Sequence, residues 1–566
     1  MFLLTPEIAW HETLPIYSCD LQPIPELREW LHQSMNQTEI NERKPLGELS
    51  INDPQISAPD ASSSATPNES DKTVWSRLAT AGGDHVIRLW RVELNYMPSS
   101  EQKDGSKSFL KGFTFISSLT KHDKPVNVVR WSNRGRYLAS GSDDSTILIW
   151  MQKPMEVVQP KPDTDQEENK ELWVPIRSLR RHLEDVFDLS WSPDDKHLMS
   201  GSVDCSVIIW NNLNLEQNEN VGLQSHKDAT VMRDAKHYIQ GVSWDPFGNY
   251  FASLSSDRHL RLYSIAQKSV TNQISKSTNK VSLFQDDSWK SFFRRLSFSP
   301  DGLLLMTPSG YVENVKFADV LDSKSNDNKS PQHAAHLFLR SKLTEPVVSY
   351  PTGVHPVICV RFCSQPFTLR KSSTQLSDDK LNKLIDLPYR WVFCLVLEDG
   401  LILCDTQYTV PFAFISSIHY QALNDASWSD NGRLLVTCST DGYCSLIYFA
   451  HEEIGIPYTH GQIGMSIIRI NQSIPVAPSN ESMLNDSAAT AALVTDNSDL
   501  QMSMTNCSTS SIVAKKTLNE SVDFVVPSEN ILPKYGEKSK GEKVEEKSVE
   551  NKEKKRRVSL ITLTKS

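Results

Sequence analysis

Short apolar segments alternate with polar turn residues over the first 450 positions of the chain. Residues 126–132 form one apolar run, which leads into the polar residues 133–136. A second run follows at 137–140, and a Gly/Ser/Asp turn separates it from a third at 146–150. Runs of this length bounded by such turns are typical of β-strands joined by tight connections. The pattern predicts an all-β chain of strand–turn–strand units.

These strand units recur at a fixed spacing. Three aspartates lie 60 residues apart and each precedes a tryptophan by six positions: Asp84 with Trp90, Asp144 with Trp150, and Asp204 with Trp210. A fourth copy places Asp257 six residues before Tyr263, and a weaker fifth places Asp441 ahead of Tyr448. Short strands that repeat in this way around a ring are typical of a β-propeller.

We expect seven blades, with six as the main alternative. Five blades are centred on the repeats, and two degenerate ones are expected near residues 294–340 and 356–404. The segment Glu7-Ile8-Ala9-Trp10-His11 is expected to add the last strand to the blade around residues 423–449. That strand would close the ring and leave no sheet edge open.

The units resemble WD repeats, a family in which four side chains form a buried hydrogen-bond relay. The matching residues are His122, Ser140, Asp144 and Trp150 in the second unit, and His182, Ser200, Asp204 and Trp210 in the third. A buried carboxylate must be hydrogen-bonded, and imidazole and hydroxyl groups can satisfy it. We therefore interpret these residues as structural rather than catalytic. The chain departs from the family because Trp90, Trp150 and Trp210 are not followed by aspartate.

The distribution of aromatic residues marks the limit of the fold. All 13 tryptophans lie at or before Trp428, and only three of the 48 aromatic residues fall in the last 116 positions. A stretch so poor in apolar side chains cannot offset the entropy lost on ordering. The sequence predicts a propeller over residues 1–455, with a long disordered loop at about 33–73, and a disordered tail over residues 456–566.

Charge is uneven along the chain. The net charge is −10, yet residues 534–566 carry 11 Lys/Arg against 6 Glu, so the preceding part is acidic. The net negative charge argues against a protein that binds polyanions over its whole surface, and against direct sequence-specific DNA binding.

No apolar run is long enough to span a membrane, and the first residues lack the features of a signal peptide. Nine cysteines without a C-x-x-C pair predict reduced thiols in the cytosol or nucleus, with no zinc site.

No motif for catalysis or cofactor binding is present. The chain lacks a phosphate-binding loop, an H-E-x-x-H zinc motif and a G-x-S-x-G nucleophile motif. The adjacent carboxylates Glu184 and Asp185 could suggest acid–base chemistry, but a loop pair of this kind is more often solvated. We expect no catalytic residue, no metal and no cofactor.

Two segments are candidates for protein contact. Phe292, Phe293 and Arg294 precede a predicted strand in which Leu296 and Phe298 point inward, so they are expected on the loop leading into it. The alternative is that both phenylalanines belong to the core.

The second candidate is the basic and apolar motif at residues 554–563. Arg556, Arg557, Val558, Leu560 and Leu563 are spaced as an extended strand would present them. Such segments can bind by strand addition, with the arginines pairing to carboxylates. A plain nuclear-localisation signal in Lys554–Arg557 is the alternative, and the two interpretations are compatible.

Five segments in order resemble the family of the mid-sized WD-repeat subunit of chromatin assembly factor 1: residues 7–11, 182–186, 240–246, 290–298 and 441–444. The resemblance covers about residues 1–460 without the 33–73 loop. Residues 556–563 resemble the motif with which that family docks the anti-silencing function histone chaperone.

The resemblance implies a nuclear histone chaperone subunit that acts as a scaffold. Its partners would be a large subunit, a second histone-binding WD-repeat subunit and the anti-silencing function chaperone. The complex would deposit newly made tetramer-forming core histones (H3-H4) during replication and repair, and the contact of this chain with histones could be indirect.

Two other functions are open. A replication-independent histone regulator has a similar propeller, but such proteins continue into a second folded domain beyond the motif. A substrate receptor of a cullin ubiquitin ligase commonly has Trp-Asp-x-Arg after a blade. Here Trp244-Asp245 is followed by Pro246-Phe247, so that tetrapeptide is absent.

Overall fold

The computed structural model describes the chain in eleven stretches: residues 1–24, 74–95, 109–154, 169–216, 223–278, 280–285, 291–312, 332–370, 385–450, 452–458 and 559–562. All regular elements named in these stretches are β-strands. The 33–73 loop and most of the predicted tail lie outside the described residues, whereas the boundary expected between residues 455 and 456 falls within the described stretch 452–458.

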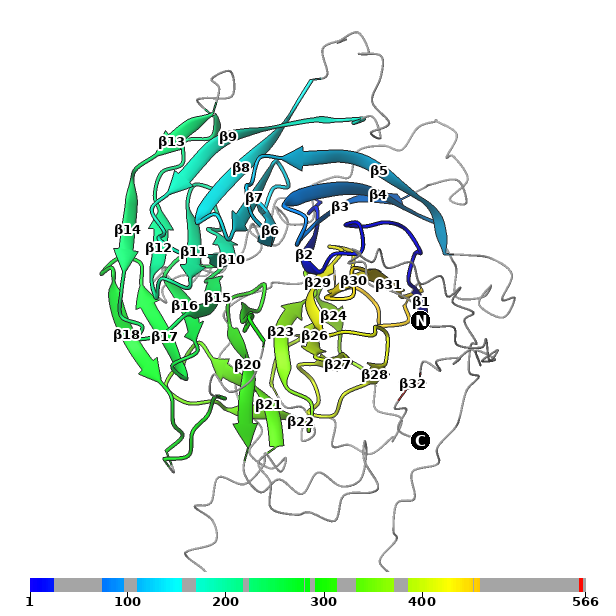
Figure 1. Ribbon diagram of the computed structural model, residues 1–566. Helices are drawn as coiled ribbons and strands as arrows, with labels where there is room; N and C mark the ends of the chain where they lie inside the picture. The colour runs from blue at the N-terminus through cyan, green and yellow to red at the C-terminus, as the bar shows by residue number, and fades with distance from the viewer. Residues whose placement is uncertain are drawn as a thin grey trace, which may run out of the picture.

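Seven sheets surround a central axis (Figure 1), which confirms the predicted seven-bladed propeller. Blade 1 contains β2 (Ile16–Leu21), β3 (Val74–Gly82), β4 (Val86–Leu94) and β5 (Leu110–Thr120). Blade 2 contains β6 (Val126–Trp131), β7 (Tyr137–Ser142), β8 (Thr146–Lys153) and β9 (Leu172–Arg180), and β13 (Gln224–His226) joins β9 in parallel. Blade 3 contains β10 (Val186–Trp191), β11 (Leu198–Ser202), β12 (Val207–Trp210) and β14 (Ala229–Met232).

The other four sheets continue the ring. Blade 4 contains β15 (Ile239–Trp244), β16 (Tyr250–Ser255), β17 (His259–Ser264) and β18 (Ser269–Ile274). Blade 5 contains β19 (Ser297–Phe298), β20 (Leu304–Val312), β21 (Gln332–Leu339) and β22 (Val348–Gly353). Blade 6 contains β23 (Val357–Phe362), β26 (Val392–Leu397), β27 (Gly400–Asp405), β28 (Ala413–Ser416) and, at its outer edge, β32 (Ser559–Thr562), while β24 (Phe367–Thr368) pairs with β25 (Tyr389–Arg390). Blade 7 contains β29 (Leu423–Trp428), β30 (Leu434–Ser439), β31 (Cys444–Tyr448) and β1 (Phe2–Leu4).

The inner strands are buried on both sides because every blade is packed between two others. All six residues of β7 are buried, so the strand lacks the in–out alternation of a solvent-facing sheet. Adjacent blades approach so closely at β7 that a Cβ added to Gly141 would lie 2.7 Å from Cγ1 of Val186 in blade 3. Gly201 has the same relation to Ile239 of blade 4. The small residue at this repeat position is therefore required by packing between blades.

The ring is closed by β1, not by the predicted segment 7–11. Phe2 pairs with Tyr448 and Leu4 with Leu446, so the amino-terminal strand does complete the blade around residues 423–449 as expected. Residues 7–11 instead form a turn in which the Trp10 indole N–H donates to the Pro6 carbonyl at 3.2 Å. Trp10 is fully buried against Trp90, an arrangement that an extended strand at the blade edge would not allow.

Blade 5 is held by a buried neutral histidine. Nε2 of His336 donates to the Leu283 carbonyl at 2.9 Å, and Nδ1 accepts from the Ser349 hydroxyl at 2.8 Å. Burial lowers the pKa of His336 to about 4. The hydrogen bond to Leu283 raises this pKa, but burial lowers it by more. The buried ring therefore stays neutral near pH 7.

Removing residues 1–4 should open the edge of β31. The amides of Leu446–Tyr448 that face β1 would lose their strand partner and exchange faster with solvent. Hydrogen–deuterium exchange by mass spectrometry measures this, with β12 of blade 3 as the internal reference. Unchanged protection across Cys444–Tyr448 would contradict the closure by β1.

Acid should destabilise the propeller in a window set by His336. The unfolded histidine takes a proton near pH 6.5 and the folded one only near 4, so stability is complete above about 6.5 and is lost as the pH falls toward 4. The loss amounts to roughly 3 kcal/mol for this group. Urea unfolding at pH 7 and pH 4.5 should show a smaller pH effect in His336→Gln than in the parent. His237→Gln, at an exposed position, serves as the control.

Candidate functional site

Both predicted relays are formed in the structure. In blade 2, His122 Nδ1 lies 2.8 Å from Asp144, His122 Nε2 lies 2.8 Å from the Ser140 hydroxyl, and the Trp150 indole donates to that hydroxyl at 2.9 Å. In blade 3, the distances are 2.9 Å for His182–Asp204, 2.7 Å for His182–Ser200 and 3.0 Å for Trp210–Ser200. Each group in the chain from Trp to Asp thus has a partner.

The relays hold the turn between two strands of a blade. Burial raises the pKa of Asp144, but the hydrogen bond and charge of His122 outweigh it, so the net pKa of Asp144 is lowered. The resulting carboxylate accepts the amides of Thr146 at 2.8 Å and Asp123 at 3.2 Å. Every polar group of the relay is therefore committed to fixing the turn between the second and third strands.

Sequence reasoning missed two relays. His11 lies 2.7 Å from Asp84 and 2.9 Å from Thr80, and Trp90 donates to Thr80. This histidine is 73 residues from its aspartate, so spacing could not reveal it. The other missed relay joins His419 to Asp441 at 3.1 Å and to Ser445 at 2.9 Å. The 22-residue separation of His419 and Asp441 matches blades 2 and 3 and was a usable signal.

The relays define one face of the ring, called here the relay face. It carries the relay histidines, the aspartate turns and the loops that lead into the innermost strands. The opposite side, where the first strand of a blade turns into the second, is called here the hairpin face. Both faces are well defined because the innermost strands share one direction, as the parallel bridge between Arg295 and Cys359 shows for blades 5 and 6.

The Phe292–Arg294 segment is divided between surface and core. Phe292 has 62% of its surface exposed, whereas Phe293 and Arg294 are buried. The expected three-residue contact patch is therefore reduced to Phe292. The reason is that Phe293 lies over the Arg295 guanidinium at 3.9 Å and the Arg294 guanidinium donates to the Gln285 carbonyl at 2.6 Å. Leu296 and Phe298 are buried as expected.

Aromatic rings close the axis on the relay face. The ring centre of Phe293 lies 6.2 Å from that of Tyr17 in blade 1 and 6.0 Å from that of Phe187 in blade 3. Phe292 stands above them, 6.2 Å from Phe187. Gln240 fixes the loop by donating to the Ser291 carbonyl at 3.1 Å. The exposed phenylalanine is thus carried by a rigid support.

Below these rings, a buried carboxylate joins residues of five blades. Asp425 of β29 contacts Arg130 of β6 at 2.8 Å, Arg361 of β23 at 2.8 Å and Arg295, next to β19, at 3.1 Å. Ser18 of β2 adds a hydrogen bond at 2.9 Å. Burial raises the pKa of Asp425, but the three guanidinium groups lower it far more, so the carboxylate stays charged.

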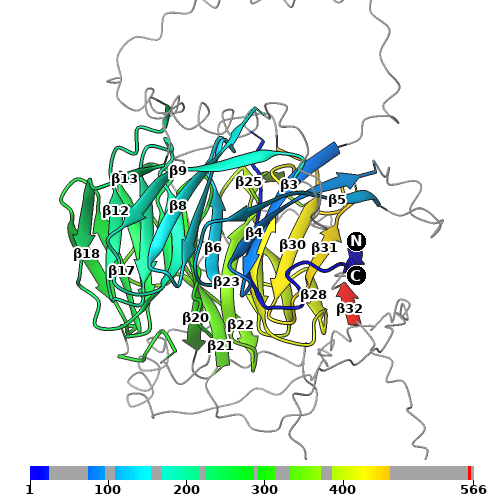
Figure 2. The ribbon, with the colours of Figure 1, turned by 45° about the horizontal axis from the view of Figure 1, so that its top comes forward.

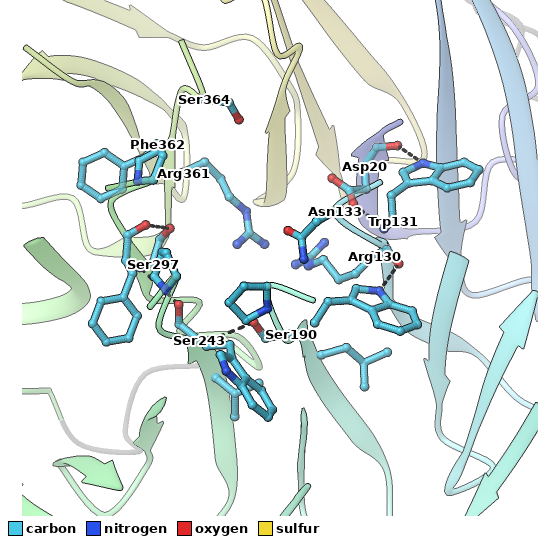
Figure 3. Close-up of a pocket in the computed structure, with 18 of the residues that line it drawn as sticks. Asp20, Arg130, Trp131, Asn133, Ser190, Ser243, Ser297, Arg361, Phe362 and Ser364 are labelled. Carbon is cyan, nitrogen blue, oxygen red and sulfur yellow. Dashed lines mark hydrogen bonds between the residues drawn. The ribbon is translucent and has the colours of Figure 1, made fainter. Parts of the chain in front are cut away.

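The hairpin face opens into a cavity of about 290 Å³. Figure 3 shows the Arg130 and Arg361 side chains directed toward its middle, with Ser190, Ser243 and Ser297 around them. The serine hydroxyls are used between blades: Ser190 accepts the amide of Trp244 at 3.0 Å, and Ser243 that of Phe298 at 3.2 Å. These two hydroxyls thus help to hold blades 3, 4 and 5 together.

The tail motif is described only in part. Arg556, Arg557, Val558 and Leu563 lie outside the described residues. Leu560 belongs to β32, whose backbone pairs antiparallel with β28, with Ser559 opposite Ser416 and Thr562 opposite Ala413. Figure 2 shows β32 beside β28 at the rim of the ring. Residues 559–562 of the motif therefore form a fifth strand on blade 6.

Neither a metal cluster nor a membrane-spanning helix occurs in the described stretches. They hold no group of three or more His, Cys, Asp or Glu side chains placed to bind a metal ion. They also contain no helix with the length and apolar character needed to cross a membrane.

Seven blades, turn-fixing relays and an axis locked by ion pairs define a WD-repeat β-propeller scaffold. The family described as CAF1B/HIR1 beta-propeller domain matches residues 51–454. The B-subunit of chromatin assembly factor 1 from Mus musculus is 35% identical over 473 residues, which cover 81% of this chain and 68% of the mouse protein. The chain therefore belongs to the CAF1B family of WD-repeat chromatin assembly proteins.

More distant relatives share the propeller. The B-subunit of chromatin assembly factor 1 from Saccharomyces cerevisiae is 28% identical over 405 residues, 66% of this chain and 80% of the yeast protein. Protein HIR1 of Mycosarcoma maydis is 28% identical over 381 residues, 67% of this chain and 32% of that protein.

Asp425→Asn should lower the free energy of unfolding by about 3–5 kcal/mol. The change leaves three guanidinium groups without their shared counter-charge in a buried place. Denaturant unfolding measures the loss. Asp386→Asn, at an exposed position, should change stability by less than about 0.5 kcal/mol. Equal stabilities of the two variants would show that the axis network is dispensable.

Proposed function

We propose that this chain is the mid-sized subunit of a nuclear chromatin assembly factor 1 complex. Its propeller acts without catalysis, as a scaffold that keeps a histone-deposition machine together during replication and repair. The single observation that carries the proposal is the 35% identity to the mouse protein over 81% of the chain. The same propeller matches Protein HIR1 at 28% identity, so a replication-independent regulator is the less favoured candidate.

The proposed partners follow from the charge and from the tail. The acidic body attracts basic histone cargo or basic segments of the large subunit over long range. The tail motif recruits the anti-silencing function chaperone by strand addition, with Arg556 and Arg557 pairing to its carboxylates. Support for strand addition comes from the backbone of Ser559–Thr562, which already adds to β28 as a strand. Lys554–Arg557 also serve as the nuclear-localisation signal.

Co-purification from S-phase nuclei tests the main proposal. The large assembly-factor subunit, the second histone-binding WD-repeat subunit and core histones should be recovered with this chain. Mass spectrometry of the purified material identifies them. Recovery of cullin adaptors in their place would reject the proposal, and recovery of replication-independent regulator subunits would favour the second candidate.

Arg556→Ala with Arg557→Ala should weaken binding of the anti-silencing function chaperone at least tenfold. Both guanidinium groups, whose planar geometry suits carboxylates, are lost while the propeller is untouched. A pull-down with purified proteins measures the effect, and the large subunit should stay bound. Lys554→Ala with Lys555→Ala removes the same charge and is the matched control. Undiminished chaperone binding by the arginine variant would reject this role of the tail.

A further inference from the structure

Exposed apolar side chains gather on the relay face. Among the described residues, twelve large apolar side chains are exposed, and half of them lie in the loops that lead into an innermost strand. We call these six the apolar ring: Leu14, Leu183, Tyr238, Phe292, Val354 and Tyr420. Scattered exposed apolar residues are ordinary, but half of the set on one face, one from each of six blades, marks that face as an interaction surface.

The apolar ring contains the most exposed members of the set. Leu183 and Val354 each expose 71% of their surface, Tyr420 exposes 66% and Phe292 62%. The six residues come from six different blades and surround the axis that the aromatic rings close. Relays fix two of these loops: the Leu183 amide donates to Asp204 at 3.0 Å and the Tyr420 amide to Asp441 at 3.0 Å. A fixed apolar surface loses little conformational entropy on binding.

The same face is acidic beside blades 2 and 3. The loops there carry six carboxylates and three cationic side chains: Asp123, Asp143, Asp144, Glu184, Asp185 and Asp204, against Lys121, Lys124 and Arg181. Burial raises the pKa of Asp185, and the neighbouring charge of Asp143 raises it further. Carboxylates that repel one another in this way favour a cationic partner.

We propose that the relay face is the docking surface for a segment of the large subunit in which apolar side chains alternate with Lys or Arg. The apolar side chains of the segment contact the apolar ring around Phe292, and its cations lie over the carboxylates of blades 2 and 3. This inference rests on the proposed function for the identity of the partner. It assigns the contact to one face of the propeller and leaves the hairpin face and the tail free for other partners.

A triple variant tests the apolar contact. Phe292→Ser, Val354→Ser and Tyr420→Ser together should weaken binding of the full-length large subunit at least tenfold in a pull-down or titration. The matched control is Leu172→Ser, Val410→Ser and Ile456→Ser, which removes three exposed apolar side chains near the hairpin face and should bind normally. Thermal unfolding of both variants should match the parent, because the substituted side chains are exposed.

The outcomes separate this inference from the proposed function. Failure of the unaltered chain to bind the large subunit would reject the proposed function. Normal binding by the relay-face variant, or loss of binding only in the control, would reject the relay face as the docking surface. Self-association of the unaltered chain that the relay-face variant abolishes in sedimentation would assign the surface to a second copy and also overturn the inference.

Charge reversal tests the proposed contact between cations of the segment and the carboxylates of blades 2 and 3. Asp123→Lys with Glu184→Lys should slow association with the large subunit severalfold, with a smaller effect at high salt, because these exposed carboxylates steer a cationic segment. Asp386→Lys, outside these loops, should have no such effect. An unchanged association rate in the double variant would show that the segment does not carry its cations over blades 2 and 3.

Discussion

The buried carboxylate of Asp425 imposes the strictest condition on this fold. A charge removed from water is tolerated only if it is paired with good geometry, and here the three pairing guanidinium groups come from three other sheets. All three pairs can form at once only when blades 2, 5, 6 and 7 meet at the axis. The relays, by contrast, each act within one blade, and apolar clusters such as those of blades 2 and 3 or blades 3 and 4 join two neighbours. The ion pairs at the axis therefore make the ring one cooperative unit.

The sequence was most informative where the structure repeats. The spacing from Asp to an aromatic residue located the turns of blades 1 to 4, and in blades 2 and 3 the serine and histidine positions followed from it, because these two blades repeat the same relay at the same place. The axis could not be inferred in this way. Arg130, Arg295, Arg361 and Asp425 come from different blades, and their charges balance only in three dimensions. The closing strand was also misplaced, because three residues such as Phe2–Leu4 are too few to show a period.

The Phe292–Phe293 pair shows where pattern analysis reaches its limit. Two adjacent aromatic residues at the start of a strand point in opposite directions, and their order in the chain does not determine which one faces inward. The structure resolves this through Arg295, whose guanidinium lies under Phe293 and draws that ring into the axis. A single buried cation thus decides which phenylalanine is presented to solvent. The difference between the two faces follows from this choice, with one end of the axis covered by rings and the other open as a cavity.

The pairing of Phe2–Leu4 with Cys444–Tyr448 also bears on how the molecule is made. Residues 2–4 must wait during synthesis for a partner that is made roughly 440 residues later. At about 5–20 residues per second, this delay is roughly 20 to 90 s. During this time residues 2–4 stay unpaired, and the blades that have already formed make an open ring. Until blade 7 is made, the ring cannot close, and its unpaired strand edges can pair with other chains.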